Sequence, residues 1–249
     1  MRPIIKTLKL TAAGVPVEYI PHDEAKPDLC DEIGTFCSFC EKYNSRSALH
    51  VEHVFAKKAK NVAGQLIYDH LKFRWDNFLL ACVNCNGVKG SKDIAVLNPY
   101  MPHENNLLCF IETITGGLIQ IKAGVAGNDL IRTQAFIDLV GLDRVPGHPK
   151  YSDKDDRWDN RLEVFDIATR QEAKYVRPNP TTDIETIVDL ARRTGYFSIW
   201  FNIFNSHNAV KNALLNGFVN QNAVLITPFP GTHVTSFDAL NNYIPLRRP

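Results

Sequence analysis

Hydrophobic residues in the first half of this chain follow a pattern that predicts two short strands and a helix. The apolar runs at residues 48–54 and 77–83 are typical of buried strands. After the second run we expect a short helix that opens near residues 84–86 and ends before Gly90. The 59–73 segment between the strands is long for a hairpin loop, so we expect a short helix within it.

The segments that flank this unit are expected to be mainly extended. Residues 1–30 contain several prolines and little helical periodicity, which predicts an N-terminal arm. Residues 94–125 are also expected to be extended. Within them, residues 111–122 alternate around Gly116 and Gly117, a pattern typical of a β-hairpin.

Three helices are predicted in the second half of the chain. Residues 129–140 carry apolar side chains at helical spacing and are followed by a glycine, a common helix stop. Residues 153–175 are highly charged but keep helical spacing of their apolar side chains. Residues 182–194 open with a Thr-x-x-Glu capping box of Thr182 and Glu185. The Asn- and Phe-rich remainder is expected to pack back on the body.

Composition and charge are those of an ordinary globular protein and give no whole-molecule signal for nucleic acid. Hydrophobic residues make up 45% of the chain, charged residues 22%, and the formal net charge is +1. Attraction to phosphate must therefore come from local clusters such as Lys57, Lys58 and Lys60. No apolar run approaches the roughly 20 residues that span a bilayer, and no signal peptide is recognised. We therefore expect a cytoplasmic protein that makes no membrane contact.

The cysteines indicate a metal site. In a compartment expected to be reducing, disulfides are disfavoured. Four of the six cysteines form two Cys-x-x-Cys pairs, Cys37/Cys40 and Cys82/Cys85, which are typical of tetrahedral zinc. A complete four-cysteine shell leaves no open position, so we expect this Zn²⁺ to be structural. The alternative is four buried cysteines that share this spacing by chance.

The residues between and after the two pairs carry a resemblance to a known family. Glu52-His53 lies between the pairs, and the Trp-Asp-Asn-Phe-Leu-Leu run that begins at Trp75 leads into Cys-x-x-Cys-Asn-x-x-Lys-Gly. From about residue 37 to residue 93 this order resembles the HNH, or ββα-metal, endonucleases. Within that family it is most similar to the nuclease subunit of Septu and retron-type anti-phage defence systems, which works with an ATPase.

The sequence patterns and the resemblance together predict an α+β fold in three parts. An N-terminal arm (1–30) would precede a zinc-stapled ββα-metal (HNH) core at 31–100. A β-hairpin and a mostly helical region (101–249) would follow and bind a partner. Within that region, Arg157, Trp158 and Arg161 offer a candidate docking surface, although a plain structural helix is an equal alternative.

The resemblance also implies roles for single residues. His53 corresponds to the general base that activates water, a task suited to a neutral imidazole. Asn77 corresponds to the Asn that orients this base through a backbone contact. Glu52 and Asn86 correspond to ligands of a catalytic Mg²⁺ or Mn²⁺, although Asn86 stands where many members carry a histidine. Lys89, one helical turn beyond Asn86, is expected to contact a substrate phosphate.

The expected function is metal-dependent hydrolysis of DNA phosphodiester bonds, as the effector subunit of a bacterial anti-phage defence system with an ATPase partner. Two alternatives stay open. The same centre could cut RNA such as tRNA, because nothing in the motif distinguishes the sugars. The chain could instead be a non-catalytic zinc-binding module for nucleic acid or protein, with Glu52 and His53 structural.

Overall fold

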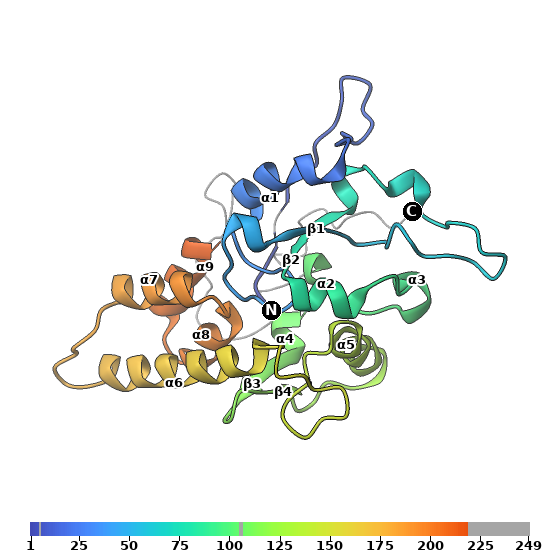
Figure 1. The fold of residues 1–249 in the computed structure, drawn as a ribbon. Coiled ribbons are helices and arrows are strands. Elements are labelled where there is room, and N and C mark those ends of the chain that lie inside the picture. The colour runs from blue at the N-terminus through green and yellow to red at the C-terminus, as the bar shows by residue number, and fades with distance from the viewer. Residues whose placement is uncertain (5, 105–106, 219–249) are drawn as a thin grey trace.

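The fold is α+β, with two antiparallel strand pairs and nine α-helices in the described part of the chain (Figure 1). The computed structural model describes residues 1–4, 6–104 and 107–218. The strands are β1 (His50–His53), β2 (Phe78–Ala81), β3 (Ile111–Ile114) and β4 (Leu118–Ile121). The helices are α1 (Lys26–Ile33), α2 (Val83–Lys89), α3 (Ile94–Leu97), α4 (Leu107–Phe110), α5 (Gly127–Val140), α6 (Arg157–Tyr175), α7 (Ile184–Thr194), α8 (Phe197–Ile203) and α9 (Asn208–Phe218).

The first strand pair and the helix after it agree with the sequence prediction. β1 pairs with β2 in a register that sets His53 opposite Phe78. All four β2 side chains are buried, because α1 and α2 both pack against this strand. The unbroken Phe-Leu-Leu-Ala run is the sequence signal of such a covered strand. α2 follows directly and ends at Gly90, whose φ of +53° lets the chain leave the helix.

Two segments predicted to be extended contain helices. α1 crosses the predicted end of the N-terminal arm, and a 3₁₀ turn (His22–Ala25) leads into it. The buried face of Leu29, Cys30 and Ile33 stabilises this short helix more than its local propensity does. In residues 94–125, α3 and α4 are short helices, so that part of the prediction is wrong. The β3–β4 hairpin around Gly116 and Gly117 is confirmed.

The loop after β1 projects from the body (Figure 1). Its arms meet in a single bridge between Lys60 and Leu66. The short helix predicted between the two strands is present only as a 3₁₀ turn at Asp69–Leu71. This loop begins directly after His53 and therefore borders the predicted reaction centre.

The three predicted helices of the second half are α5, α6 and α7. α5 ends at Gly141, whose φ is +61°. The N-cap of α7 is Asp183, which accepts a hydrogen bond from the Thr186 amide at 2.7 Å. The predicted cap at Thr182 is therefore one residue too early. α8 and α9 pack back on the body as expected, and residues 219–249 lie outside the described residues.

Buried apolar side chains form two clusters. The first surrounds β1, β2 and α2 and draws on residues from Met1 to Leu142, including Met101 and Leu107. The predicted boundary near residue 100 thus falls within one continuous core. The second cluster lies among α6 to α9, which gather on one side of the β1–β2 pair in Figure 1. None of the described helices has the length and apolar character that crossing a membrane requires.

Candidate functional site

The two Cys-x-x-Cys pairs meet at the N-terminus of α2. Cys82 is the N-cap of this helix, and Cys85 lies one turn further on. The four sulfurs are buried within 4.8 Å of one another, and the Sγ atoms of Cys40 and Cys82 are 3.8 Å apart. Zn–S bonds of about 2.3 Å in a tetrahedron place the sulfurs about 3.8 Å from each other. Cys37, Cys40, Cys82 and Cys85 can therefore hold one structural metal ion such as zinc.

Burial and hydrogen bonding set the charge of this cluster. Burial raises the pKa of the Cys40 and Cys85 thiols well above the ordinary value. Hydrogen bonds from the other three sulfurs lower the pKa of Cys82. The Cys85 amide also donates to Cys82 Sγ at 3.4 Å. A divalent cation would hold all four groups as thiolates, so metal binding would release protons.

A buried guanidinium lies against the cysteine cluster. Arg157, the first residue of α6, is 2% exposed. Its Nη1 donates to Cys85 Sγ at 3.2 Å and to the Val140 carbonyl at 2.7 Å. Its Nη2 donates to the Gly141 carbonyl and to Asp155, and its Nε donates to Asp155 at 2.8 Å. All five N–H groups of the guanidinium are thus used. Arg157 therefore lies buried against the candidate metal site, and the predicted docking surface does not include it.

His53, the predicted general base, sits at the end of β1 and is 4% exposed. Its Nε2 is 2.8 Å from the Lys72 carbonyl oxygen. A carbonyl only accepts, so Nε2 carries the proton and Nδ1 keeps its lone pair in the neutral ring. Burial lowers the pKa of His53 to about 4, with Lys57, His22 and Lys89 adding to the decrease. The imidazole is therefore neutral at pH 7.

Glu52 and Lys89 form a buried ion pair. Lys89 Nζ is 2.7 Å from Glu52 Oε1 and also donates to the His53 carbonyl at 2.7 Å. The Lys89 side chain is 0% exposed and that of Glu52 is 9% exposed. Lys89 therefore faces inward, and the expectation that it contacts a substrate phosphate does not agree with this position. Burial raises the pKa of Glu52, and Lys89 opposes that increase.

Asn77 links the two ends of the loop after β1. Its side-chain oxygen accepts from the Phe55 amide at 2.8 Å. Its amide nitrogen donates to the carbonyls of Phe55 and Leu71, at 3.2 and 3.1 Å. Leu71 immediately precedes Lys72, whose carbonyl holds His53. Asn77 thus fixes backbone on both sides of His53 through these three contacts, and none of them involves the imidazole.

The residues predicted to bind a catalytic cation do not form a complete shell. Glu52 shares its carboxylate with Lys89, and Asn86 is half-buried on α2. Among the described residues, three or more His, Cys, Asp or Glu side chains lie close enough to share an ion only at the four cysteines. Glu52 belongs to no such group. These residues do not by themselves fit Mg²⁺ or Mn²⁺.

Three residues near His53 were not predicted to belong to its site, and of these only Lys57 had been singled out, as part of a lysine cluster that could attract phosphate. The His22 ring lies 4.9 Å from the His53 ring, centroid to centroid. Lys57 Nζ is 3.1 Å from His22 Nε2, and Lys72 supplies the carbonyl that holds His53. His22 lies 31 residues before His53 in the sequence, and no spacing rule connects the two. Only the contact of the His22–Ala25 turn with β1 brings them together.

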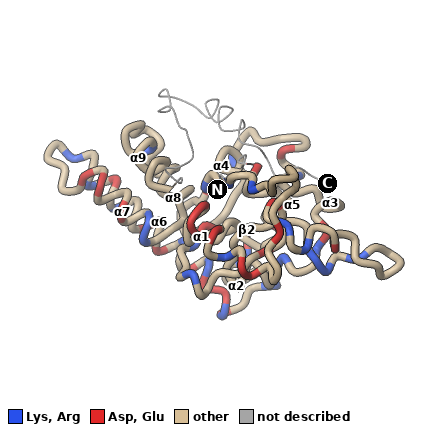
Figure 2. Tube along the Cα trace, turned by 90° about the horizontal axis from the view of Figure 1, so that it is seen from above, with Lys and Arg blue, Asp and Glu red and all other residues tan. Residues whose placement is uncertain are grey.

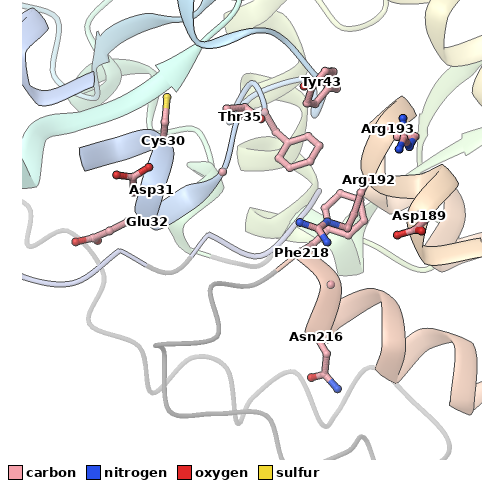
Figure 3. A pocket seen from close by; sticks show the side chains of 13 residues that line it. Cys30, Asp31, Glu32, Thr35, Tyr43, Asp189, Arg192, Arg193, Asn216 and Phe218 are labelled. Carbon is pink, nitrogen blue, oxygen red and sulfur yellow. The ribbon is translucent and has the colours of Figure 1, made fainter. Parts of the chain in front are cut away.

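A separate cavity of about 990 Å³ lies between the loop after α1 and the C-terminal helices (Figure 3). Arg192 and Asp189 of α7 line it, and Asp31 and Glu32 of α1 lie opposite. None of the predicted site residues lines this cavity. Its mixture of positive and negative groups does not identify a ligand.

Comparisons of the chain with protein-family models, with curated proteins and with solved structures found no match.

Proposed function

We propose that this chain is a metal-dependent HNH endonuclease that hydrolyses DNA phosphodiester bonds, with His53 as the general base. The observation that carries the proposal is the contact between His53 Nε2 and the Lys72 carbonyl. This contact leaves Nδ1 as the free base, and the low pKa keeps it unprotonated at pH 7. The order of β1, β2 and α2, with α2 packed on both strands beside the four cysteines, supports the same proposal.

In the proposed reaction, His53 Nδ1 takes a proton from water as its oxygen attacks phosphorus. The P–O bond on the opposite side breaks, and the leaving oxygen takes a proton from solvent, which gives a phosphate monoester and a hydroxyl. The residues near His53 do not form a complete cation shell, so the dependence of this reaction on a divalent cation rests on the family resemblance alone. Asn77 acts indirectly by holding the backbone around His53. The defence role and the ATPase partner rest on the family resemblance and belong to the proposal.

The test is cleavage by the purified full chain, assayed on plasmid DNA and on tRNA with Mg²⁺, Mn²⁺ or EDTA. We expect His53→Ala to lower the cleavage rate by about 10²- to 10⁴-fold. His50→Ala is the matched control, because His50 lies on the same strand but is exposed, and it should cleave like the wild type. Cleavage that His53→Ala leaves unchanged would contradict the proposal. Cleavage of tRNA alone would move it to the RNA alternative.

The non-catalytic alternative has a specific observation in its favour, the buried pair of Glu52 and Lys89. Phage plating on cells that carry the chain with its neighbouring genes separates the readings. Loss of protection in both His53→Ala and Cys82→Ser supports catalysis. Loss in Cys82→Ser alone supports a zinc-dependent module. Copurification of an ATPase with the wild-type chain tests the proposed partner.

A further inference from the structure

The side of His53 that faces the projecting loop is lined by residues outside the predicted motif. The His22 ring contacts the His53 ring at 4.9 Å between centroids and at an angle of 50°. His22 also lies 6.4 Å from the Phe78 ring. The His22 side chain keeps 19% exposure, whereas His53 itself is 4% exposed. On this side of His53, solvent therefore reaches the His22 ring more readily than the His53 ring.

His22 holds a lysine at this edge. Lys57 Nζ is 3.1 Å from His22 Nε2. An ammonium only donates, so His22 Nε2 accepts and its Nδ1 carries the proton. Burial, followed by the charge of Lys57, lowers the pKa of His22, which is consistent with a neutral acceptor at pH 7. A lysine side chain normally loses much conformational entropy when it binds a ligand, and a prior contact reduces that loss.

The charges around this edge favour an anion. Lys57 and Lys72 both lower the pKa of His22, whereas Asp23, 3.5 Å from His22 Nε2, raises it. Asp23 is largely exposed, so its charge is screened by water. Figure 2 shows several Lys and Arg positions at the root of the projecting loop. Lys89, the lysine expected to contact phosphate, is fully buried on Glu52 and leaves that role to another residue.

We propose that Lys57 contacts a phosphate of the nucleic acid beside His53, and that His22 is the positioning residue that holds the Lys57 ammonium there. This inference rests on the proposed function and deepens it, because it names the phosphate contact of the same centre. The phosphate-binding group thus comes from the projecting loop and is positioned by the N-terminal segment. Neither belongs to the strand pair or to α2.

The test is binding of a fluorescein-labelled duplex DNA of about 20 base pairs, and of the matching RNA duplex, measured by anisotropy in EDTA over a range of salt concentrations. We expect Lys57→Met to weaken binding about five- to tenfold and to reduce the slope of log affinity against log salt by about one. Lys154→Met is the control for the lost charge, because Lys154 is exposed in the loop before α6. It should bind within about twofold of the wild type.

The role of His22 needs its own variants. We expect His22→Phe, which keeps a ring but no acceptor, to weaken binding as Lys57→Met does. The double variant should bind no more weakly than either single variant, because both changes remove one contact. His22→Gln keeps an acceptor and should restore most of the affinity. Unfolding midpoints measured alongside identify any variant whose fold has changed, and a His22→Gln variant that stays as weak as His22→Phe would contradict the positioning role.

The binding assay separates this inference from the proposed function. If Lys57→Met leaves affinity and salt slope unchanged, the inference is wrong, although cleavage through His53 can still stand. If binding depends on Lys57 and the wild type cleaves neither DNA nor RNA, the proposed function is wrong and the inference stands. A wild-type chain that binds neither duplex overturns the inference directly.

Discussion

At His53, one backbone carbonyl decides which ring nitrogen is free to act as a base. The Lys72 oxygen accepts the Nε2 proton, and burial makes protonation of Nδ1 costly. A similar effect applies to Glu52, whose buried carboxylate is balanced by Lys89. The chemical state of each side chain is thus set by a neighbour that is distant in sequence.

The low pKa of His53 predicts a dependence of stability on pH. The unfolded chain, with a histidine pKa near 6.5, binds a proton that the folded chain does not bind until about pH 4. The contribution of His53 to stability is therefore fully present above pH 6.5 and is lost as pH decreases to 4. At 1.36 kcal/mol per pKa unit, this loss amounts to about 3 kcal/mol at most.

The measurement is the free energy of unfolding in urea at several pH values, for the wild type and His53→Gln. Both chains keep the four cysteines, so acid-induced metal loss cancels in the difference. We expect the difference between the two chains to change by up to about 3 kcal/mol over this range. A difference that does not vary with pH would show that His53 is not held neutral.

At the scale of elements, α6 is joined to the cysteine cluster through its first turn. Arg157 connects Cys85 of α2 with the carbonyls of Val140 and Gly141 at the end of α5. Arg161, one turn later, donates to the carbonyls of Gly117 and Leu142 instead of to a sulfur. The two buried arginines thus have similar structural roles, but Arg157 alone of the pair donates to the metal site.

This difference gives a matched pair of variants. We expect Arg157→Met and Arg161→Met both to destabilise the fold, because each removes a buried, hydrogen-bonded guanidinium. Arg157→Met should lower the free energy of unfolding by about 3 to 5 kcal/mol, because the substitution leaves the Asp155 carboxylate without its ionic partner. Only Arg157→Met should also weaken zinc retention, by about 10- to 100-fold.

Zinc release into a coloured chelator, measured at a temperature where both variants remain folded, checks this prediction. Zinc content by atomic absorption before the assay confirms equal loading. If Arg161→Met releases zinc as fast as Arg157→Met, the effect comes from general destabilisation and not from the contact with Cys85.

At the scale of the whole molecule, the C-terminal helices are packed directly on the loop that carries the first cysteine pair, the candidate zinc loop. The Tyr196 amide donates to the Glu41 carbonyl at 3.0 Å, and Lys42 forms a bridge with Gly195. The buried Glu41 carboxylate accepts hydrogen bonds from the Arg2 amide and from Ser198. The N-terminus, the zinc loop and α8 therefore meet at one residue, and loss of zinc should loosen all three.

Gly195 lies where the turn between α7 and α8 packs against the backbone of residues 41–43. Its φ is +77°, and an added Cβ would lie 2.6 Å from the Glu41 oxygen and 2.6 Å from the Tyr43 nitrogen. We expect Gly195→Ala to lower the free energy of unfolding by about 2 to 5 kcal/mol, from backbone strain and overpacking together. Gly14→Ala is the control, because Gly14 has a φ of +76° and nothing within 4 Å. It should cost about 1 to 2 kcal/mol.

Urea unfolding of the two variants with zinc present measures the difference. Equal losses in Gly195→Ala and Gly14→Ala would mean that the α7–α8 turn can move away from the zinc loop. A larger loss in Gly195→Ala supports the close packing of the two parts.

Local sequence signals determined much of this protein. The paired cysteines indicated a metal site, because a Cys-x-x-Cys turn places both sulfurs on one ion within four residues. β1, β2, α2, α5 and the β3–β4 hairpin follow from apolar patterning and from glycines at positions of positive φ. Each of these signals lies within a few residues of the structure it predicts.

Only the tertiary structure decided the neighbours of Glu52, His53 and the cysteine cluster. The position of Lys89 in the sequence predicted a contact with phosphate. In the folded chain, however, β1 places Glu52 within hydrogen-bond distance of Lys89. His22 carried no local signal, since it contacts a residue 31 positions away. Arg157 was expected on a docking surface, but it contacts a sulfur 72 positions away. Burial and pairing depend on which segments pack together, and that information is spread over the whole chain.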